Sequence, residues 1–141
     1  MNKILIYTDG GSRGNPGPAA IGAIINDKKY GEYIGETTNN VAEYKAVIFA
    51  LKKIKQLIGK NKTKNTEIEI RTDSELLYKQ NKGEYKIEND DLKMLFIDIW
   101  NLKQDFKKVE FVLISRDKNK EADKLVNEIL NTHNSNLKLR I

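Results

Sequence analysis

Three strand patterns follow one another at the start of the chain, joined by connections too short to contain a helix. Residues 4–8, 19–25 and 30–36 are rich in apolar and β-branched side chains, which favour extended backbone. Residues 10–22 hold five of the nine glycines and both prolines, a composition typical of tight turns. Because short connections join antiparallel strands, this part of the chain predicts an antiparallel meander.

The remainder of the chain alternates helix and strand patterns. Residues 38–40 offer N-cap side chains for a helix whose apolar residues recur at helical spacing up to Gly59. Residues 67–73 alternate apolar and charged side chains, as in a strand with one buried face. Four further elements are predicted in this order: a short helix at 74–80, a helix capped by Asn89, a strand at 109–114 and a final helix around 122–129.

With the short helix at 74–80 not counted, the order is β-β-β-α-β-α-β-α, which predicts an α/β fold in which helices pack on a mixed five-stranded sheet. We expect a single domain over residues 1–131, because the sequence contains no internal repeat and no second domain. Residues 132–141 are expected to form a C-terminal tail. The chain is expected to be loose from Asn131 as far as residues 137–141, which either dock as a short extended piece or fray.

Composition narrows the chemistry that the chain can perform. The absence of cysteine excludes disulfides and thiolate metal sites, and a single histidine disfavours a histidine metal site or a Ser–His triad. A formal net charge of +5 suggests a polyanionic partner. No signal-like segment opens the chain, and no apolar run approaches the roughly 20 residues needed to span a bilayer. We therefore expect a soluble protein of the cytoplasm with no membrane partner.

Four acids stand at the predicted ends of elements and are spread over almost the whole chain: Asp9, Glu43, Asp73 and Asp123. Each also has a local explanation, because Asp9 suits a turn and Asp73 suits a helix cap. Glu43 and Asp123 suit the positive end of a helix dipole. If folding gathers the four acids, their repulsion requires a proton or a cation. Since carboxylate oxygens suit Mg²⁺ and Mn²⁺, we expect one of these ions as cofactor.

The motifs around these acids resemble those of type 1 ribonuclease H, the ribonuclease HI family, over residues 4–130. In chain order they are Tyr7-Thr8-Asp9-Gly10-Gly11-Ser12, Gly14-Asn15-Pro16-Gly17-Pro18, Thr38-Asn39-Asn40-Val41-Ala42-Glu43, Thr72-Asp73-Ser74 and Asn119-Lys120-Glu121-Ala122-Asp123. Asp-Gly-Gly alone is common in turns, whereas five motifs in order on the expected elements are a specific signal. The resemblance implies a ribonuclease H-like catalytic domain over residues 1–131.

The resemblance also implies an activity and a set of site residues. The activity is endonucleolytic hydrolysis of the RNA strand of RNA–DNA hybrids, leaving 5′-phosphate and 3′-hydroxyl ends. The implied catalytic set is the four acids, which hold two Mg²⁺ or Mn²⁺ ions when substrate is bound. The implied contacts to the hybrid are Gly10, Gly11, Ser12, Asn15, Thr38, Asn39, Asn40, Ser74 and Tyr85. For the asparagines and the threonine, turn formation and helix capping are the alternatives.

The chain departs from the family pattern near the last acid. Many members carry a histidine on a loop before it, whereas residues 115–119 contain none and Arg116 is the best-placed substitute. Because a guanidinium stays charged, Arg116 cannot act as a base. It is expected to hold a phosphate or stabilise the leaving group, with simple solvation as the alternative. His133 follows Asp123, so we expect it to be a surface residue of the tail.

Charged residues near the expected substrate path are mixed in sign. The lysine-rich residues 79–86 resemble a substrate-facing segment, but the segment between Asp73 and Asn89 is too short for the basic helix that some members add. Glu75 stands where the family often has a neutral residue, and it weakens substrate contact or points to solvent. The lysines of residues 60–64 are expected to be solvated.

Two other functions stay open from the sequence. One is a non-catalytic module that binds hybrids, although such a module is expected to lose acids that this chain keeps. The other is a nuclease of the same fold that acts on DNA strands or junctions. For the favoured enzyme we expect a monomer whose partner is an RNA–DNA hybrid.

Overall fold

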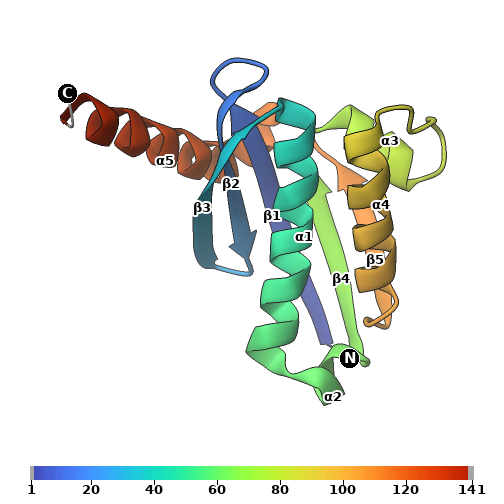
Figure 1. Ribbon diagram of the computed structural model, residues 1–141. Helices are drawn as coiled ribbons and strands as arrows, with labels where there is room; N and C mark the ends of the chain where they lie inside the picture. Colours follow the sequence, from blue (N-terminus) through green and yellow to red (C-terminus); the bar gives the residue numbers. More distant parts are fainter. Residues whose placement is uncertain (1, 140–141) are drawn as a thin grey trace.

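The computed structural model of the chain describes residues 2–139, with side chains described up to residue 133. The predicted elements occur in the predicted order, and a short helix at Lys60–Thr63 and a 3₁₀ turn at Arg116–Asn119 occur in addition (Figure 1). The elements are β1 (Asn2–Ser12), β2 (Gly17–Ile25), β3 (Lys28–Thr37), α1 (Asn39–Ile58), α2 (Lys60–Thr63), β4 (Thr66–Thr72), α3 (Glu75–Asn81), α4 (Asp90–Lys103), β5 (Lys108–Leu113), a 3₁₀ turn (Arg116–Asn119) and α5 (Lys120–Leu139). Within the described residues, no helix is long and apolar enough to cross a membrane.

The five strands form one mixed sheet in the order β3-β2-β1-β4-β5. β2 runs antiparallel to both β1 and β3, as the predicted meander requires. β4 runs parallel to β1 and to β5, so the carboxyl ends of these three strands meet at one edge of the sheet. The predicted fold class is confirmed, and β1 is the central strand.

β1 is longer than the sequence predicts. Residues 10–12 continue the strand instead of starting a loop, because they pair with residues 19–21 of β2. The connection is correspondingly short, and the Arg13 N–H donates to the Pro18 carbonyl over 2.8 Å to close it. The glycines that suggested a loop therefore lie partly inside the sheet.

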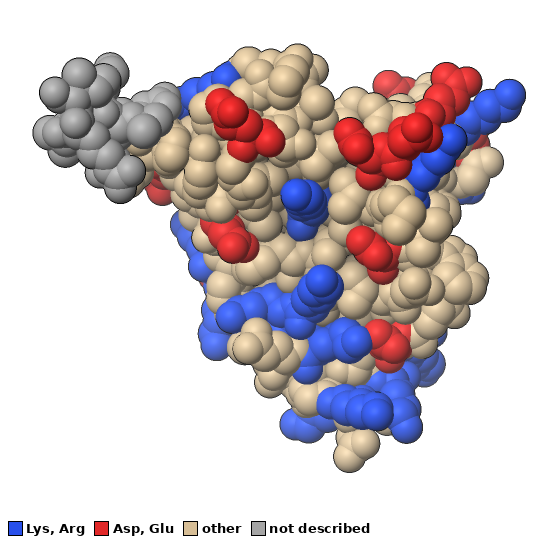
Figure 2. Space-filling view, viewed as in Figure 1, with Lys and Arg blue, Asp and Glu red and all other residues tan. Residues whose placement is uncertain are grey.

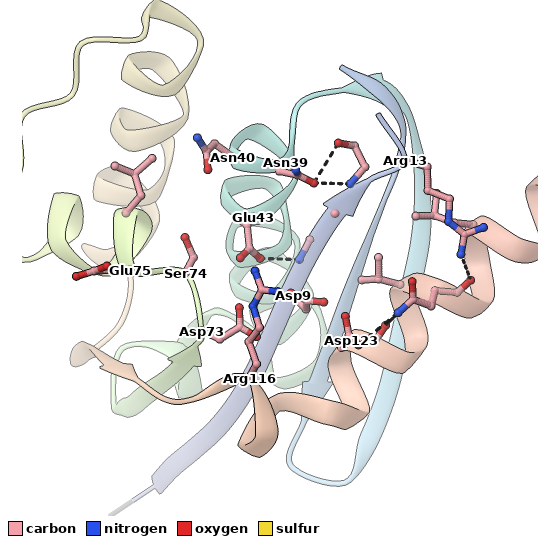
Figure 3. Close-up of a pocket in the computed structure, with 17 residues that line it drawn as sticks. Asp9, Arg13, Asn39, Asn40, Glu43, Asp73, Ser74, Glu75, Arg116 and Asp123 are labelled. Atoms are coloured by element: carbon pink, nitrogen blue, oxygen red, sulfur yellow. Dashed lines mark hydrogen bonds between the residues drawn. The ribbon is translucent and has the colours of Figure 1, made fainter. Parts of the chain in front are cut away.

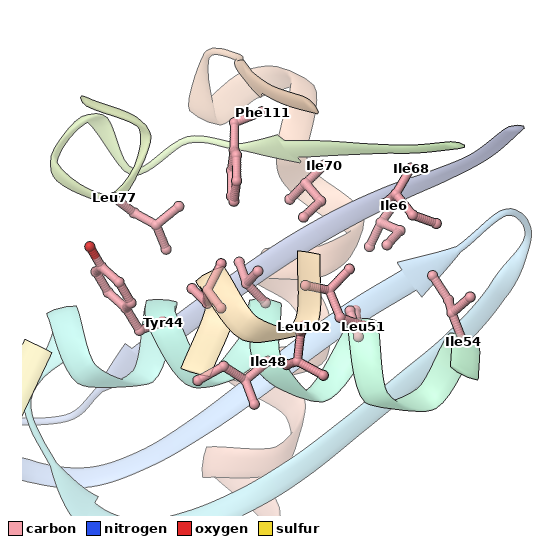
Figure 4. Close-up of a cluster of buried hydrophobic side chains, with 14 of the residues drawn as sticks. Ile6, Tyr44, Ile48, Leu51, Ile54, Ile68, Ile70, Leu77, Leu102 and Phe111 are labelled. Atoms are coloured by element: carbon pink, nitrogen blue, oxygen red, sulfur yellow. The ribbon is translucent and has the colours of Figure 1, made fainter. Parts of the chain in front are cut away.

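Helices cover both faces of the sheet. α1 lies on one face with α4 packed beside it, and α5 crosses β2 and β3 on the other face (Figure 1). The main core lies between α1 and the sheet, where Ile6, Leu51 and Ile70 are fully buried (Figure 4). A smaller cluster under α5 contains Ala20 and Val126. The carboxyl edge of the central strands is thus bordered by a helix on each side.

The predicted ends of α1 are confirmed. The Thr38 hydroxyl accepts a hydrogen bond from the Val41 N–H over 3.3 Å, which caps the amino end. Gly59 ends the helix with a φ of 82°, a backbone conformation that glycine adopts without strain. These caps fix the amino end of α1 beside the carboxyl edge of the sheet.

The expectation of a loose segment from Asn131 onward is wrong, because α5 continues without a break to Leu139. Residues 131–136 are polar and have modest helix propensity, so the sequence contained no sign that the helix continues.

His133 is not a free surface residue either. Its ring stacks on Tyr33 of β3, with centroids 3.9 Å apart and planes 16° apart. The domain boundary at residue 131 stays a prediction, and residues 140–141 lie outside the described residues.

Candidate active site

Two of the four acids come from neighbouring parallel strands. β1 and β4 pair so that Tyr7 lies opposite Arg71. Asp9 is two residues beyond Tyr7, and Asp73 is two residues beyond Arg71, so the same register brings the two acids level. The carboxyl edge of parallel strands is a common place for ligand sites in α/β proteins.

Glu43 reaches this edge from α1, which lies directly on β1. The main-chain N–H of Gly10 donates to Glu43 Oε1 over 2.6 Å (Figure 3). A Cβ atom at position 10 would lie 2.3 Å from the carbonyl carbon of Ala42, so only glycine fits there. This glycine lets α1 approach β1 closely enough for Glu43 to join Asp9.

Three of the acids form a tight group. One carboxylate oxygen from each of Asp9, Glu43 and Asp73 lies within 4.8 Å of the others. Asp123, in the first turn of α5, is exposed and lies outside this group. It is nevertheless a neighbour of Asp9, because its charge and a side-chain hydrogen bond both act on the Asp9 carboxyl. Folding thus gathers three predicted acids and sets the fourth beside them.

The two buried acids of the group hold protons to unusually high pH. Burial, followed by the charges of Asp73 and Asp123, raises the pKa of Asp9 from 3.8 to about 8. Burial also raises the pKa of Glu43 well above its ordinary value, with Asp9 and Asp73 adding to the shift. The Arg116 guanidinium acts on the Glu43 pKa in the opposite direction without cancelling the shift. Crowded carboxyls that resist ionisation favour a bound cation.

A pocket of about 730 Å³ surrounds the acids. Besides the four acids, the predicted residues that line it are Gly10, Gly11, Ser12, Asn39, Asn40, Ser74 and Arg116. The other predicted substrate residues, Asn15, Thr38 and Tyr85, do not line it. The pocket therefore joins most of the predicted set and leaves three of its members outside.

A short chain of hydrogen bonds orders one wall of the pocket. The N–H and hydroxyl of Ser12 donate to Asn39 Oδ1 over 2.8 and 3.1 Å (Figure 3). The Asn39 N–H donates in turn to Asn15 Oδ1 over 3.0 Å. Asn15 thus satisfies the first N–H of α1 from outside the pocket. Asn40 follows on the same wall and is exposed.

The opposite wall begins at α3. The Ser74 hydroxyl accepts from the Leu77 N–H over 3.2 Å, so Ser74 caps this helix while it lines the pocket. Glu75 also lines the pocket, and its carboxylate pairs with Lys79 over 3.4 Å. Tyr85 lies farther along, 45% exposed, with the Lys79 ammonium 5.0 Å from its ring centroid.

Arg116 lies on the 3₁₀ turn between β5 and α5. Its side chain is exposed, and Figure 3 shows it extending from this turn toward the grouped carboxylates. Its positive charge favours the ionised form of Glu43. Arg116 thus lines the pocket with the acids, and its role as a substitute for the family's histidine stays a prediction.

Three pocket or near-pocket residues were missed from the sequence. Asn119 is 1% exposed and donates to Asp73 Oδ2 over 3.1 Å. Asn127 donates to Asp123 Oδ2 over 3.3 Å, and its carbonyl accepts from the Arg13 guanidinium over 3.4 Å. The spacing of four residues between Asp123 and Asn127 was a readable signal, since such pairs share a helix face. Nothing local marks Arg13, because its contact depends on the tertiary fold.

A protein-family model described as "Reverse transcriptase-like" matches residues 7–129 of this chain. Two solved structures of one protein are similar throughout. LC11-RNase H1, isolated from compost by a metagenomic approach, is 47% identical with a TM-score of 0.86, over 94% of this chain and 99% of that one. The structure of LC11-RNase H1 in complex with an RNA/DNA hybrid matches with a TM-score of 0.82, over 89% of this chain and 94% of that one, at 47% identity.

Curated relatives are longer proteins. Ribonuclease HI of Halobacterium salinarum is 36% identical over 91% of this chain and 64% of its own length. The bifunctional protein Rv2228c of Mycobacterium tuberculosis is 34% identical over 91% of this chain. This chain spans 35% of the length of Rv2228c.

Proposed function

This chain belongs to the ribonuclease H family, in its type 1 branch, and on that premise we propose that it hydrolyses the RNA strand of RNA–DNA hybrids. The observation that carries the proposal is the group of Asp9, Glu43 and Asp73, whose oxygens lie within 4.8 Å of one another in a pocket of about 730 Å³. The 47% identical LC11-RNase H1, which has been crystallised with an RNA/DNA hybrid, supports the substrate class.

The residues present fit divalent cations. Every donor in the group is a carboxylate oxygen, the ligand that Mg²⁺ and Mn²⁺ prefer. The raised pKa of Asp9 and of Glu43 gives an independent reason, because a bound cation offsets both the burial and the neighbouring charges that raise them. We propose that Asp9, Glu43 and Asp73 form the cation site and that Asp123 completes a second one when substrate is bound. Bound there, the ions supply an activated water and stabilise the leaving oxygen.

The chain's own residues orient the reaction. The Gly10 N–H donates to one oxygen of Glu43 and so holds this carboxylate in place beside Asp9 and Asp73. The main chain of residues 10–12 lines the pocket without bulky side chains, which permits close approach to a minor groove. Selection of RNA rests on its 2′-hydroxyl, a group that DNA lacks.

Arg116 is proposed to bind the phosphate at the scissile bond. Its guanidinium extends toward the carboxylates and donates in a planar fork that suits phosphate (Figure 3). It cannot accept a proton, so it supports charge on the leaving group and does not act as a base. The water oxygen attaches to phosphorus, the bond from phosphorus to O3′ breaks, and O3′ takes a proton. The products are a 5′-phosphate and a 3′-hydroxyl.

A cleavage experiment tests the proposal. RNA–DNA hybrid, duplex RNA and duplex DNA of one sequence are incubated with the protein, each with EDTA, Mg²⁺ or Mn²⁺. We expect cutting of the hybrid's RNA strand only when a divalent ion is present. Whether duplex RNA is also cut, and which ion works better, are read from the same gel.

Two outcomes would replace the proposal. Hybrid binding without cation-dependent turnover would identify a binding module. A chimeric hybrid with deoxyribose at the cleavage position separates the remaining alternative, because cutting there would identify a nuclease that does not require the 2′-hydroxyl. Mass analysis of the products assigns the end groups.

A further inference from the structure

One amide group joins three segments that carry the site acids. Asn119, at the end of the 3₁₀ turn, is 1% exposed. Its Nδ2 donates to the main-chain carbonyl of Thr8 over 2.9 Å and to Asp73 Oδ2 over 3.1 Å. A single NH₂ group thereby ties the start of α5 to Thr8 within β1 and to the residue after β4.

The orientation of this amide is dictated by its two acceptors. Both partners of Nδ2 are oxygens that can only accept, so a flipped amide would bring oxygen against oxygen. In this orientation, Asn119 Oδ1 is buried and accepts no hydrogen bond from residues 2–133, whose side chains the structure describes. The donor end of the amide therefore faces the segments that carry the site acids.

The two bonds act on the geometry of the acids. Thr8 immediately precedes Asp9, so the first bond fixes the backbone from which the Asp9 side chain emerges. The second bond occupies one oxygen of Asp73 and leaves the other for the carboxylate group. Because Asn119 lies one helical turn before Asp123, the same anchor also sets where α5 begins relative to the sheet.

We propose that Asn119 is a positioning residue, which holds the Asp73 carboxylate and the β1 backbone at Asp9 in the spacing that binding of a divalent cation requires. The inference rests on the proposed function. Residues that orient metal ligands through hydrogen bonds are as much a part of such sites as the ligands, and their loss typically costs about 10- to 100-fold in metal affinity or activity.

Asn119→Asp tests the donor role with little change in shape. Aspartate cannot keep both hydrogen bonds, because its ionised form donates none and its protonated form has a single O–H to donate. We expect Mn²⁺ binding, measured by isothermal titration calorimetry, to weaken about 10-fold or more. In cleavage assays kcat should fall by a similar factor while KM for the hybrid stays within about 2-fold, because Asn119 does not line the pocket where substrate docks.

Gln80→Glu is the matched control. Gln80 is 4% exposed, and its Nε2 donates to the Lys86 carbonyl over 3.1 Å. Its Oε1 accepts from the Tyr44 hydroxyl over 2.6 Å, so it is another buried amide with a donor and an acceptor. This change also buries an acid, and we expect a comparable fall in melting temperature. Mn²⁺ binding and kcat should match those of the unaltered chain, because none of its hydrogen-bond partners is a site acid.

The outcomes distinguish a failure of the positioning role of Asn119 from a failure of the proposed function. If Asn119→Asp is folded by circular dichroism and binds Mn²⁺ like the unaltered chain, the positioning role is wrong. If Asn119→Asp does not fold, Asn119→Ala takes its place, since it removes the donor without adding a charge, and the same loss of Mn²⁺ affinity is expected. If the unaltered chain itself neither binds Mn²⁺ nor cuts the hybrid, the proposed function fails and not this inference alone.

Discussion

At the scale of single residues, substitution of Asp9 is the strongest test of the cation site, because Asp9 is 7% exposed and faces other acids. Asp9→Asn should abolish cleavage, since an amide is a poor ligand for the proposed cation. The metal-free protein should become more stable by about 1 kcal/mol or more, the equivalent of roughly one pKa unit, because a buried site that resists ionisation is removed. Thermal melts in EDTA and a cleavage assay measure the two effects.

Asp117→Asn provides the comparison for that change. Asp117 is an exposed acid on the same 3₁₀ turn as Arg116 and does not line the main pocket. Both its melting temperature and its cleavage rate should match those of the unaltered chain. A large loss of stability in Asp9→Asn would instead identify Asp9 as a structural residue.

The raised pKa of Asp9 also predicts how stability depends on pH. Between the ordinary value of 3.8 and about 8, folded Asp9 binds a proton that the unfolded chain has released. Stability therefore falls as pH rises through this window and is level outside it, as far as this group is concerned. The melting-temperature advantage of Asp9→Asn over the unaltered chain should accordingly grow from pH 4 to pH 8. A constant difference across that range would contradict the raised pKa.

Cation binding should show the complementary dependence. Ligand carboxyls must lose their protons before they coordinate, so Mn²⁺ affinity should increase as pH rises toward 8. Calorimetric titrations in two buffers of different ionisation enthalpy measure the affinity and the number of protons released together. Release of no protons at pH 6 would contradict the assignment of Asp9 and Glu43 as buried, protonated ligands.

The sequence identified the four acids more readily than the residues that hydrogen-bond to them. The four acids were identified because each belongs to a motif with a fixed order along the chain. Asn119 was overlooked as a site residue, since its importance comes from which carbonyl and which carboxylate lie within reach after folding. The separation of Asp123 from the tight group was equally hidden, because a motif does not specify side-chain distances.

At the scale of elements, the contact between β1 and α1 depends on Gly10. Gly10→Ala should destabilise the protein by roughly 1–3 kcal/mol, because the new methyl group collides with the Ala42 carbonyl and α1 must move. Gly11→Ala is the comparison, since its nearest contact is Val126 Cγ1 at 3.5 Å, an ordinary packing distance. Urea denaturation of the two variants should show a clear loss only for position 10.

The anchoring of α5 on β3 gives a second test at this scale. His133→Ala should lower the free energy of unfolding by about 1 kcal/mol, the value of a stacked aromatic pair. Thr132→Ala is the adjacent comparison, because the Thr132 hydroxyl donates only to Glu128 within the same helix. Equal effects of the two changes in chemical denaturation would contradict a stabilising stack.

The elements themselves were largely predictable, with two instructive exceptions. Periodicity located the helices and the alternating strand β4, because one buried face imposes a regular pattern. Gly10 and its neighbours suggested a loop, yet pairing with β2 overrides local preference and extends β1. The polar residues after Asn131 gave no apolar stripe, so the continuation of α5 left no readable pattern.

At the scale of the whole molecule, positive charge is unevenly distributed. Figure 2 shows lysine and arginine gathered over the lower half of this face, where α2 and the turn between β2 and β3 lie in Figure 1. The acids of the candidate site stand at the other end, at the carboxyl edge of the sheet. Lys82 and Lys86 come shortly after α3 in the sequence, and α3 begins with the pocket residue Glu75.

Two double variants separate these lysine groups. Lys82→Gln with Lys86→Gln should weaken hybrid binding and reduce the salt dependence of log Kd by about 1 to 2, if both lysines contact phosphates. Lys60→Gln with Lys62→Gln removes the same charge on α2 and should leave the salt dependence unchanged. Fluorescence anisotropy across a salt series measures both. A larger effect of the α2 pair would place the binding surface at the opposite end of the molecule.

The expected monomeric state and cytoplasmic location stay predictions.

The four acids belong to β1, α1, the segment after β4, and α5, so the first and last of them are separated by most of the chain. A polypeptide still emerging from the ribosome lacks α5 and has not yet docked its final carboxylate. On the proposed function, the full set of carboxylates therefore assembles only after α5 has been synthesised, and a nascent chain without α5 carries an incomplete cation site.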